Sequence, residues 1–193
     1  MQIVTSSGQL VKGPNDDSEG YWADRKNHDL YRLQLGIVRS MFPNVKSAID
    51  VGCYTSAVMV EMDWVPKRVV TDIRTNLSEN WSGVEGVQFV PGDAFNLKFE
   101  ELFDLVLSNQ TIEHLENPAD FVRKLLQLGK SLVISTTFEV AAGVIPGHVQ
   151  DPISLEKFNS WFPAHIKIDS YMICGHPTAR SIKHIIAVIK KTR

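Results

Sequence analysis

The sequence has few cysteines and no clustered positive charge. Its 193 residues include only two cysteines, Cys53 and Cys174, and neither belongs to a C-x-x-C pair or a metal-ligand spacing. The 20 Lys and Arg residues are balanced by 22 Asp and Glu residues, and no long basic run occurs. Proteins that bind nucleic acid need clustered Lys and Arg against the phosphates. Nucleic acid is therefore not expected as the main partner.

Long apolar runs and a secretion signal are also missing. The longest apolar runs are too short to span a bilayer, so no membrane partner is expected. The start of the sequence shows no signal-peptide pattern, which makes a reducing cytoplasm the expected compartment. No internal repeat, low-complexity tract or linker divides the chain. With 44% hydrophobic residues, a chain of this length is expected to bury a full core as one domain.

The first 44 residues predict an arm followed by a helix. Residues 1–20 are rich in Ser, Gly, Asn and Asp, which favours an arm or loop. Residues 22–41 predict a helix, because apolar residues recur there at three- and four-residue steps. Pro43 and Asn44 end that pattern.

From residue 47 onward, short apolar runs alternate with helical or loop stretches. The pattern predicts strands at 47–51, 67–73, 87–93, 103–109 and 131–138, and helices at 56–62, 117–129 and 151–163. The last helix is expected to be capped by Asp151 or Ser154 and to turn Leu155, Phe158, Trp161 and Phe162 toward the core.

Two further strands close the chain. They are predicted within 165–174 and 181–190, and the joint GHPTAR between them is too short for a crossover, so they must be antiparallel. Strands that alternate with helical connectors predict an α/β fold with a doubly wound, mostly parallel sheet. We therefore expect seven strands covered on both faces, with an antiparallel C-terminal hairpin.

Polar residues gather where the predicted strands end. Ligands of open α/β sheets bind at the carboxyl ends of the strands, and the candidates there are Asp50, Gly52, Cys53, Tyr54, Asp72, Asp93, Ala94, Asn109 and Gln110. Asp72 lies twenty residues after Gly52, at the distance where a carboxylate accepts the hydroxyls of an adenosine ribose. Asp93 stands where an acid accepts an amino hydrogen of adenine. Each acid alone can equally cap a helix or turn, but three acids at successive strand ends favour a ligand.

These motifs resemble those of class I S-adenosylmethionine-dependent methyltransferases over roughly residues 45 to 190. SAIDVGCYTS is similar to the family's first motif, hydrophobic-D-x-G-x-G-x-G; RVVTDI and VQFVPGDAFNL resemble the second and third, and FDLVLSNQTIEHL the fourth-strand motif. The resemblance implies the Rossmann-like fold, S-adenosylmethionine as cofactor, and methyl transfer. It also implies a single methyltransferase domain over 1–193, with an N-terminal arm and cover helix (1–44) before the Rossmann-like core (45–193). The absence of an intact G-x-G-x-x-G argues against a dehydrogenase.

The first motif departs from the family pattern. It keeps only Gly52, while Tyr54 and Ser56 stand where later glycines are usual. Either Tyr54 packs over the methionine end of the cofactor, or it fills the space of a lost cofactor. The presence of both adenosine-side acids favours the first interpretation.

The resemblance also marks candidates near the transferring methyl. His114 and His148 are candidate bases, although each can instead organise its own turn. Tyr21 and Trp22 are expected in a lid over the cofactor, or Trp22 anchors the helix to the domain. Gln110 is a substrate-side candidate. The other histidines, His28, His165, His176 and His184, show no ligand spacing, so no metal is expected.

The expected activity is methyl transfer to a small-molecule acceptor, such as a hydroxyl of a sugar or biosynthetic intermediate. This expectation comes from the near-neutral charge and the lack of an appended domain. Two alternatives stay open: a methyltransferase-fold protein that binds or scaffolds without catalysis, and a protein or RNA methyltransferase. The sequence does not indicate an oligomeric state.

Overall fold

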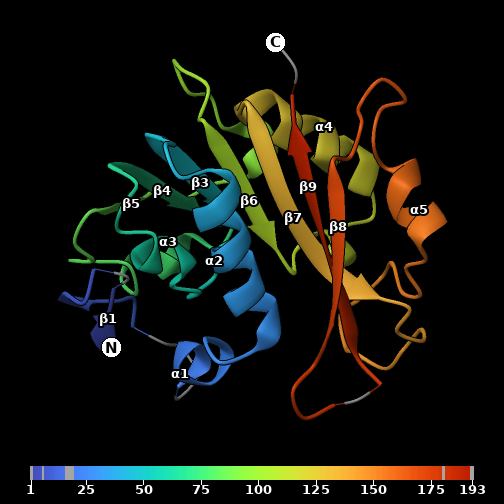
Figure 1. Ribbon diagram of the computed structural model, residues 1–193, viewed down its shortest axis with the longest axis horizontal. Helices are drawn as coiled ribbons and strands as arrows, with labels where there is room; N and C mark the ends of the chain where they lie inside the picture. Colours follow the sequence, from blue (N-terminus) through green and yellow to red (C-terminus); the bar gives the residue numbers. More distant parts are fainter. Residues whose placement is uncertain (1, 6, 16–19, 180, 192–193) are drawn as a thin grey trace.

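The computed structural model describes residues 2–5, 7–15, 20–179 and 181–191. Its central feature is a seven-stranded sheet in the order β5-β4-β3-β6-β7-β9-β8 (Figure 1). The strands are β3 (Ser47–Val51), β4 (Lys67–Thr71), β5 (Val87–Phe89), β6 (Leu105–Asn109), β7 (Ser131–Phe138), β8 (Ser170–Gly175) and β9 (Lys183–Lys190). The pairs from β5 through β7 are parallel, whereas β9 runs antiparallel to both β7 and β8. The predicted fold class, including the closing hairpin, is confirmed.

Helices cover both faces of this sheet. In Figure 1, α2 (Asp29–Met41) crosses in front of the strands and α4 (Pro118–Leu128) lies behind them. Successive strand residues point to opposite faces, so Ala48 joins the apolar cluster under α2 and α3 (Val58–Glu61), while Ile49 joins the cluster under α4 and α5 (Leu155–Ser160). Three 3₁₀ helices, η1 (Thr75–Ser78), η2 (Ala94–Asn96) and η3 (Ile112–His114), follow strands β4, β5 and β6. No helix among the described residues is long and apolar enough to cross a bilayer.

The N-terminal segment differs from the predicted arm and single helix. Two short strands, β1 (Gln2–Val4) and β2 (Leu10–Lys12), form a separate antiparallel pair, and Ile3 is buried in the core. The predicted helix 22–41 is two helices, α1 (Tyr21–Arg25) and α2, because His28 takes an extended backbone (φ −69°, ψ 139°) that a continuous helix excludes. Residues 1, 6 and 16–19 of the predicted arm lie outside the described residues.

The predicted helix 151–163 is also shorter than expected. Ser154 caps α5, because its hydroxyl accepts a hydrogen bond from the Lys157 N–H at 3.1 Å. Asp151 is not the cap: its buried carboxylate accepts from Thr137 and contacts His148. Leu155 is 42% exposed and does not face the core as predicted, since it is the first residue of the helix and lies outside the buried stripe.

A buried histidine joins the hairpin to the start of α2. His184 on β9 is 7% exposed, and its ring centroid lies 6.2 Å from that of His176, which lies 4.6 Å from that of His28. Burial is the main cause that lowers the pKa of His184 to about 4, and the neighbouring His176, His28 and Arg25 add to it.

This burial makes stability depend on pH. His184 takes up a proton near pH 6.5 in the unfolded chain but only near pH 4 in the folded chain. The stability that the buried neutral imidazole contributes is therefore fully present above pH 6.5 and is lost as the pH falls toward 4. Between pH 6.5 and pH 4 the unfolding free energy should fall by roughly 1–3 kcal/mol less in His184→Phe than in the parent. Urea titrations at several pH values measure this difference. The exposed His165→Gln is the matched control. An unchanged pH profile of His184→Phe would contradict this account.

Candidate functional site

A cavity of about 480 Å³ opens at the carboxyl ends of β3, β4 and β6. It contains most of the residues that the sequence analysis singled out: Tyr21, Asp50, Gly52, Cys53, Tyr54, Asp72, Asp93, Ala94, Asn109, Gln110 and His114. Its volume falls within the range of small-molecule sites. The parallel register explains the convergence, since strands that run in one direction end at one edge of the sheet.

Two predicted residues do not line this cavity. Trp22 is fully buried and packs edge-on against Tyr31, with ring centroids 5.2 Å apart. Trp22 therefore anchors the N-terminal helices to the core and is not part of a lid surface. His148 lies in the loop before α5 and not in the cavity lining, and its ring centroid is 4.7 Å from that of His114.

The loop after β3 is held against the end of β4. The backbone N–H groups of Gly52 and Cys53 both donate to the Thr71 carbonyl, at 2.9 and 3.1 Å. Gly52 takes φ +80°, and a Cβ there would lie 2.3 Å from the Thr111 hydroxyl oxygen. Only glycine fits this position, both for its left-handed backbone and for the space beside it.

Tyr54 also takes a left-handed backbone, with φ +46°. Two hydrogen bonds fix it: its N–H donates to Asp72 Oδ2 at 2.9 Å, and its carbonyl accepts from the Trp81 indole N–H at 2.7 Å. Its ring meets Tyr21 edge-on at 4.9 Å, and the Arg74 guanidinium lies 5.0 Å from the ring centroid. The cavity remains open beside the ring, so Tyr54 does not fill it.

The two predicted adenosine-side acids also hold their own loops. Asp72 accepts from the backbone N–H of Arg74 at 3.0 Å as well as from Tyr54. Asp93 caps η2 by accepting from the Phe95 N–H at 3.0 Å. An ionised carboxylate offers about four acceptor positions. Each acid can therefore serve its loop and still accept from a ligand in the cavity.

Asp50 lies at the floor of the cavity with no hydrogen-bond partner for either oxygen among the described residues. Burial, followed by the charge of Asp72, raises the pKa of its carboxyl to about 7. Asn109 offsets part of that rise, although its Nδ2 does not reach hydrogen-bond geometry. The hydroxyls of Ser56 and Thr71 also line the cavity without a partner in the described part of the chain. Buried polar atoms rarely stay unpaired, so this wall suits a polar ligand.

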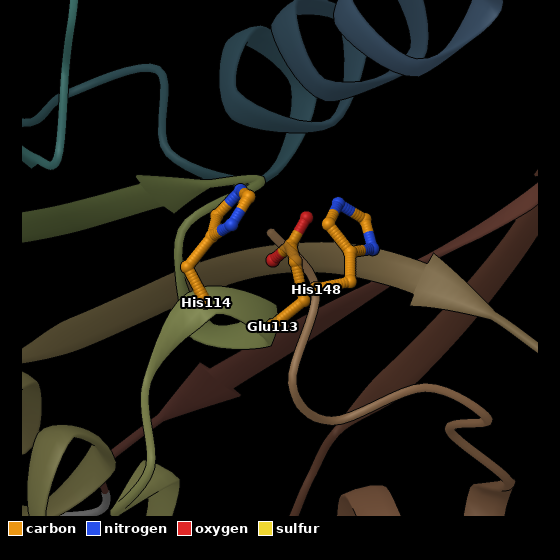
Figure 2. Close-up of side chains that lie close together, drawn as sticks. All are labelled: Glu113, His114 and His148. Carbon is orange, nitrogen blue, oxygen red and sulfur yellow. The ribbon is translucent and has the colours of Figure 1, made fainter. Parts of the chain in front are cut away.

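Three side chains form a cluster beside the cavity (Figure 2). Glu113 and His114 come from η3 and His148 from the loop before α5, and one ligand-type atom of each lies within 4.8 Å of the others. Glu113 is fully buried, and burial raises the pKa of its carboxyl to about 8. Two backbone bonds tie the elements together, because the Glu113 carbonyl accepts from the N–H groups of Val149 and Gln150.

Sequence reasoning missed several residues of the cavity wall. Ile73 lines it although it is 69% exposed, and Tyr31, Arg74 and Thr111 line it as well. Ile73 directly follows Asp72, so an apolar residue beside that acid was the available signal. Tyr31 had no such signal, because it reaches the cavity from α2.

The family model of the methyltransferase domain matches residues 49–132. The N-methyltransferase NodS from Bradyrhizobium japonicum, crystallised with S-adenosyl-L-homocysteine, has a TM-score of 0.70 at 15% identity, covering 92% of this chain and 94% of that one. A search of the curated proteins found no significant match.

Two other solved structures share the fold. The [4+2]-cyclase SpnF has a TM-score of 0.68 at 15% identity, covering 93% of this chain and 86% of that one. The N-terminal domain of EvdMO1, studied with S-adenosyl-L-homocysteine and D-fucose, has a TM-score of 0.61 at 13% identity, covering 86% and 84%. These likenesses show that the chain has the fold of these proteins.

The geometry of the β3 loop predicts a large effect of one methyl group. Gly52→Ala adds a Cβ into the Thr111 side chain at a positive φ, so we expect a loss of roughly 2–4 kcal/mol of unfolding free energy. Gly36→Ala in α2 is the matched control, because no atom lies within 4 Å of its added Cβ and alanine favours a helix. Equal melting temperatures of the two variants would contradict the assignment.

The unpaired Asp50 carboxyl predicts a second effect. Its folded pKa of about 7 exceeds the value of 3.8 for a free carboxyl, so the folded chain is penalised as the pH rises from about 4 to 7. We expect Asp50→Asn to gain roughly 2–4 kcal/mol of unfolding free energy relative to the parent between pH 4 and pH 8. Denaturant titrations of the ligand-free protein measure this, with the exposed Asp120→Asn as control. A pH-independent difference would show that Asp50 is ionised without penalty.

Proposed function

We propose that this chain, whose fold is that of the class I S-adenosylmethionine-dependent methyltransferases, binds S-adenosylmethionine in the cavity and transfers its methyl group to a small-molecule acceptor. One observation carries the proposal: an open cavity brings Asp50, Asp72 and Asp93 together with buried polar atoms that lack partners in the described chain. When bound, the cofactor supplies a reactive methyl on a sulfonium. The residues of the chain then have to bind, align and exclude water.

The adenosine end of the cofactor fits the wall formed by β4 and η2. Asp72 would accept from the ribose hydroxyls and Asp93 from the adenine amino group. The exposed side chains of Ile73 and Phe95 add apolar surface to the same cavity. Exposed apolar side chains at a cavity mouth suit the flat faces of an adenine ring.

The methionine end fits the floor of the cavity. Asp50 lacks a partner there, and an ionised Asp50 would pair with the cofactor's amino group. Tyr54 and Tyr21 meet edge-on at the same wall, where aromatic faces favour positively charged groups such as a sulfonium. This role would account for a bulky residue in a loop where glycine is usual in the resembled family.

The acceptor we propose is a hydroxyl of a sugar or biosynthetic intermediate. Methylation of a hydroxyl forms a C–O bond, breaks the C–S bond with its electron pair left on sulfur, and releases the hydroxyl proton. The cluster of Glu113, His114 and His148 is the group placed to activate that hydroxyl, because His114 lines the cavity. The fold shared with the EvdMO1 domain, which was studied with D-fucose, supports a sugar.

A second function shares this fold. SpnF is a cyclase with a similar fold, so the cavity can also hold a ligand without methyl transfer. A turnover assay with S-adenosylmethionine that carries a labelled methyl group distinguishes the two functions. Transfer of the label only when a hydroxyl compound is present supports methyl transfer. Tight binding of the cofactor without any transfer across sugar and polyol acceptors favours the non-methylating function.

Cofactor binding is the first prediction to test. Calorimetric titration with S-adenosylmethionine and S-adenosyl-L-homocysteine should give micromolar dissociation constants. Asp72→Ala should weaken both by roughly 10- to 100-fold, because a charge-assisted hydrogen bond contributes about 1.5–3 kcal/mol. The exposed Asp120→Ala should bind as the parent does. Since Asp72 also holds the Tyr54 loop, circular dichroism must show a folded variant. No heat of binding by the folded parent up to about millimolar ligand would overturn the proposal.

A further inference from the structure

The imidazoles of His114 and His148 are both held in one defined tautomer. His114 Nδ1 lies 2.9 Å from the Gly147 carbonyl oxygen, and His148 Nδ1 lies 2.8 Å from Asp151 Oδ2. Both oxygens are acceptors, so each neutral ring carries its hydrogen on Nδ1. The lone pair of each ring is then on Nε2. A histidine whose second nitrogen donates to a carbonyl or carboxylate is the arrangement that orients metal ligands in proteins.

Glu113 contributes an oxygen that the described chain does not use. Its Oε2 accepts from the Thr136 hydroxyl at 3.0 Å, while its Oε1 is buried without a hydrogen-bond partner among the described residues. Figure 2 shows the carboxylate lying between the two imidazoles, with all three side chains directed to the same side. A buried carboxylate oxygen without a partner carries a desolvation cost, which a bound cation would relieve.

Hydrogen bonds from neighbouring residues hold these side chains and their loop in place. Asp151 is almost fully buried and also accepts from the Thr137 hydroxyl at 2.8 Å, which orients it toward His148. Gln150 donates from its side chain to the Leu115 carbonyl at 2.7 Å, and its backbone N–H donates to Glu113. The loop before α5 is thereby bonded to η3 and to Leu115, the residue that follows it.

We propose that Glu113, His114 and His148 bind one divalent transition-metal ion, such as Zn²⁺ or Co²⁺, at the edge of the cavity. Two imidazole nitrogens and one carboxylate are a known ligand set for such ions, and they leave further positions open. His114 is exposed and lines the cavity, so an open position is reached from the side where the acceptor would lie. This assignment departs from the absence of a metal expected from the sequence.

The ion gives the acceptor hydroxyl a defined place, and this step rests on the proposed function. A hydroxyl bound to a divalent cation loses its proton more readily. The proton leaves to solvent, the oxygen attacks the methyl carbon, and the sulfur keeps the electron pair of the broken bond. His114 and His148 then act as ligands and not as bases. An ion at this place would therefore favour acceptors that carry a hydroxyl.

Metal binding is tested on the full chain without cofactor. After chelator treatment, titration with Co²⁺ should give one saturable equivalent and a visible ligand-field absorption, and Zn²⁺ should displace it. Glu113→Gln keeps the side-chain shape and should weaken Co²⁺ binding at least 100-fold. Glu116→Gln, an exposed neighbour on the same segment, should leave it unchanged.

A positioning role is tested at Asp151. Asp151→Asn removes the charge behind His148 but keeps its size, and loss of such a partner typically costs 10- to 100-fold in metal affinity. The absorption spectrum of the Co²⁺ form should shift as well, because the orientation of the imidazole changes. A purely structural Asp151 would lower the melting temperature without changing the affinity of the folded protein for Co²⁺.

The outcomes separate this proposal from the proposed function. Co²⁺ binding that is lost in Glu113→Gln supports the metal site whether or not S-adenosyl-L-homocysteine binds. No saturable Co²⁺ or Zn²⁺ binding by the folded parent, or full binding by Glu113→Gln, overturns it. Binding of S-adenosyl-L-homocysteine to the chelator-treated protein is read separately by calorimetry. Its failure would overturn only the cofactor assignment.

Discussion

The carboxylate of Asp72 is the contact on which the arrangement of the cavity depends. Its two oxygens accept from the backbone N–H groups of Tyr54 and Arg74, and so join the loop after β3 to the loop after β4. The Thr71 carbonyl reinforces the joint by accepting from Gly52 and Cys53. Because charge-assisted hydrogen bonds are the stronger ones, this clamp can hold Tyr54 in a left-handed backbone. This clamp sets the position of the Tyr54 ring at the cavity wall.

Two buried carboxyl groups near the ends of β3 and β6 carry a desolvation cost. Asp50 and Glu113 are both fully buried, each has a carboxylate oxygen without a partner among the described residues, and burial raises the pKa of both. Such groups cost stability, and the two apolar clusters on the faces of the sheet offset that cost. The apolar clusters on the two faces of the sheet thus supply the stability. The carboxyl edge of the sheet keeps unpaired polar atoms that a ligand can bind. Binding would relieve part of the same cost.

The local pattern of apolar residues predicted the strands of the sheet correctly but not the N-terminal segment. The predicted strands 47–51 and 131–138 match β3 and β7 residue for residue, because a buried strand is a continuous apolar run between breakers. The N-terminal arm failed as a prediction because Ile3 is buried by contacts with distant residues and not by its own neighbours in sequence. No glycine or proline marks the helix break at His28, so the apolar periodicity predicted one continuous helix there. Trp22 was ambiguous in sequence, and only packing against Tyr31 decided it.

The sequence by itself determined the sheet, its closing hairpin, and the acids at the strand ends. These follow from the order of apolar runs and from the rule that parallel strands end at one edge. The tertiary structure alone decided that Tyr31 reaches the cavity from α2 and that His148 meets Glu113 and His114. His148 lies in a loop without periodicity, beyond the whole of α4 and β7. The backbone bonds from Val149 and Gln150 to Glu113, together with the His114–Gly147 and Gln150–Leu115 bonds, bring it back to η3. No local pattern encodes a contact between segments so far apart.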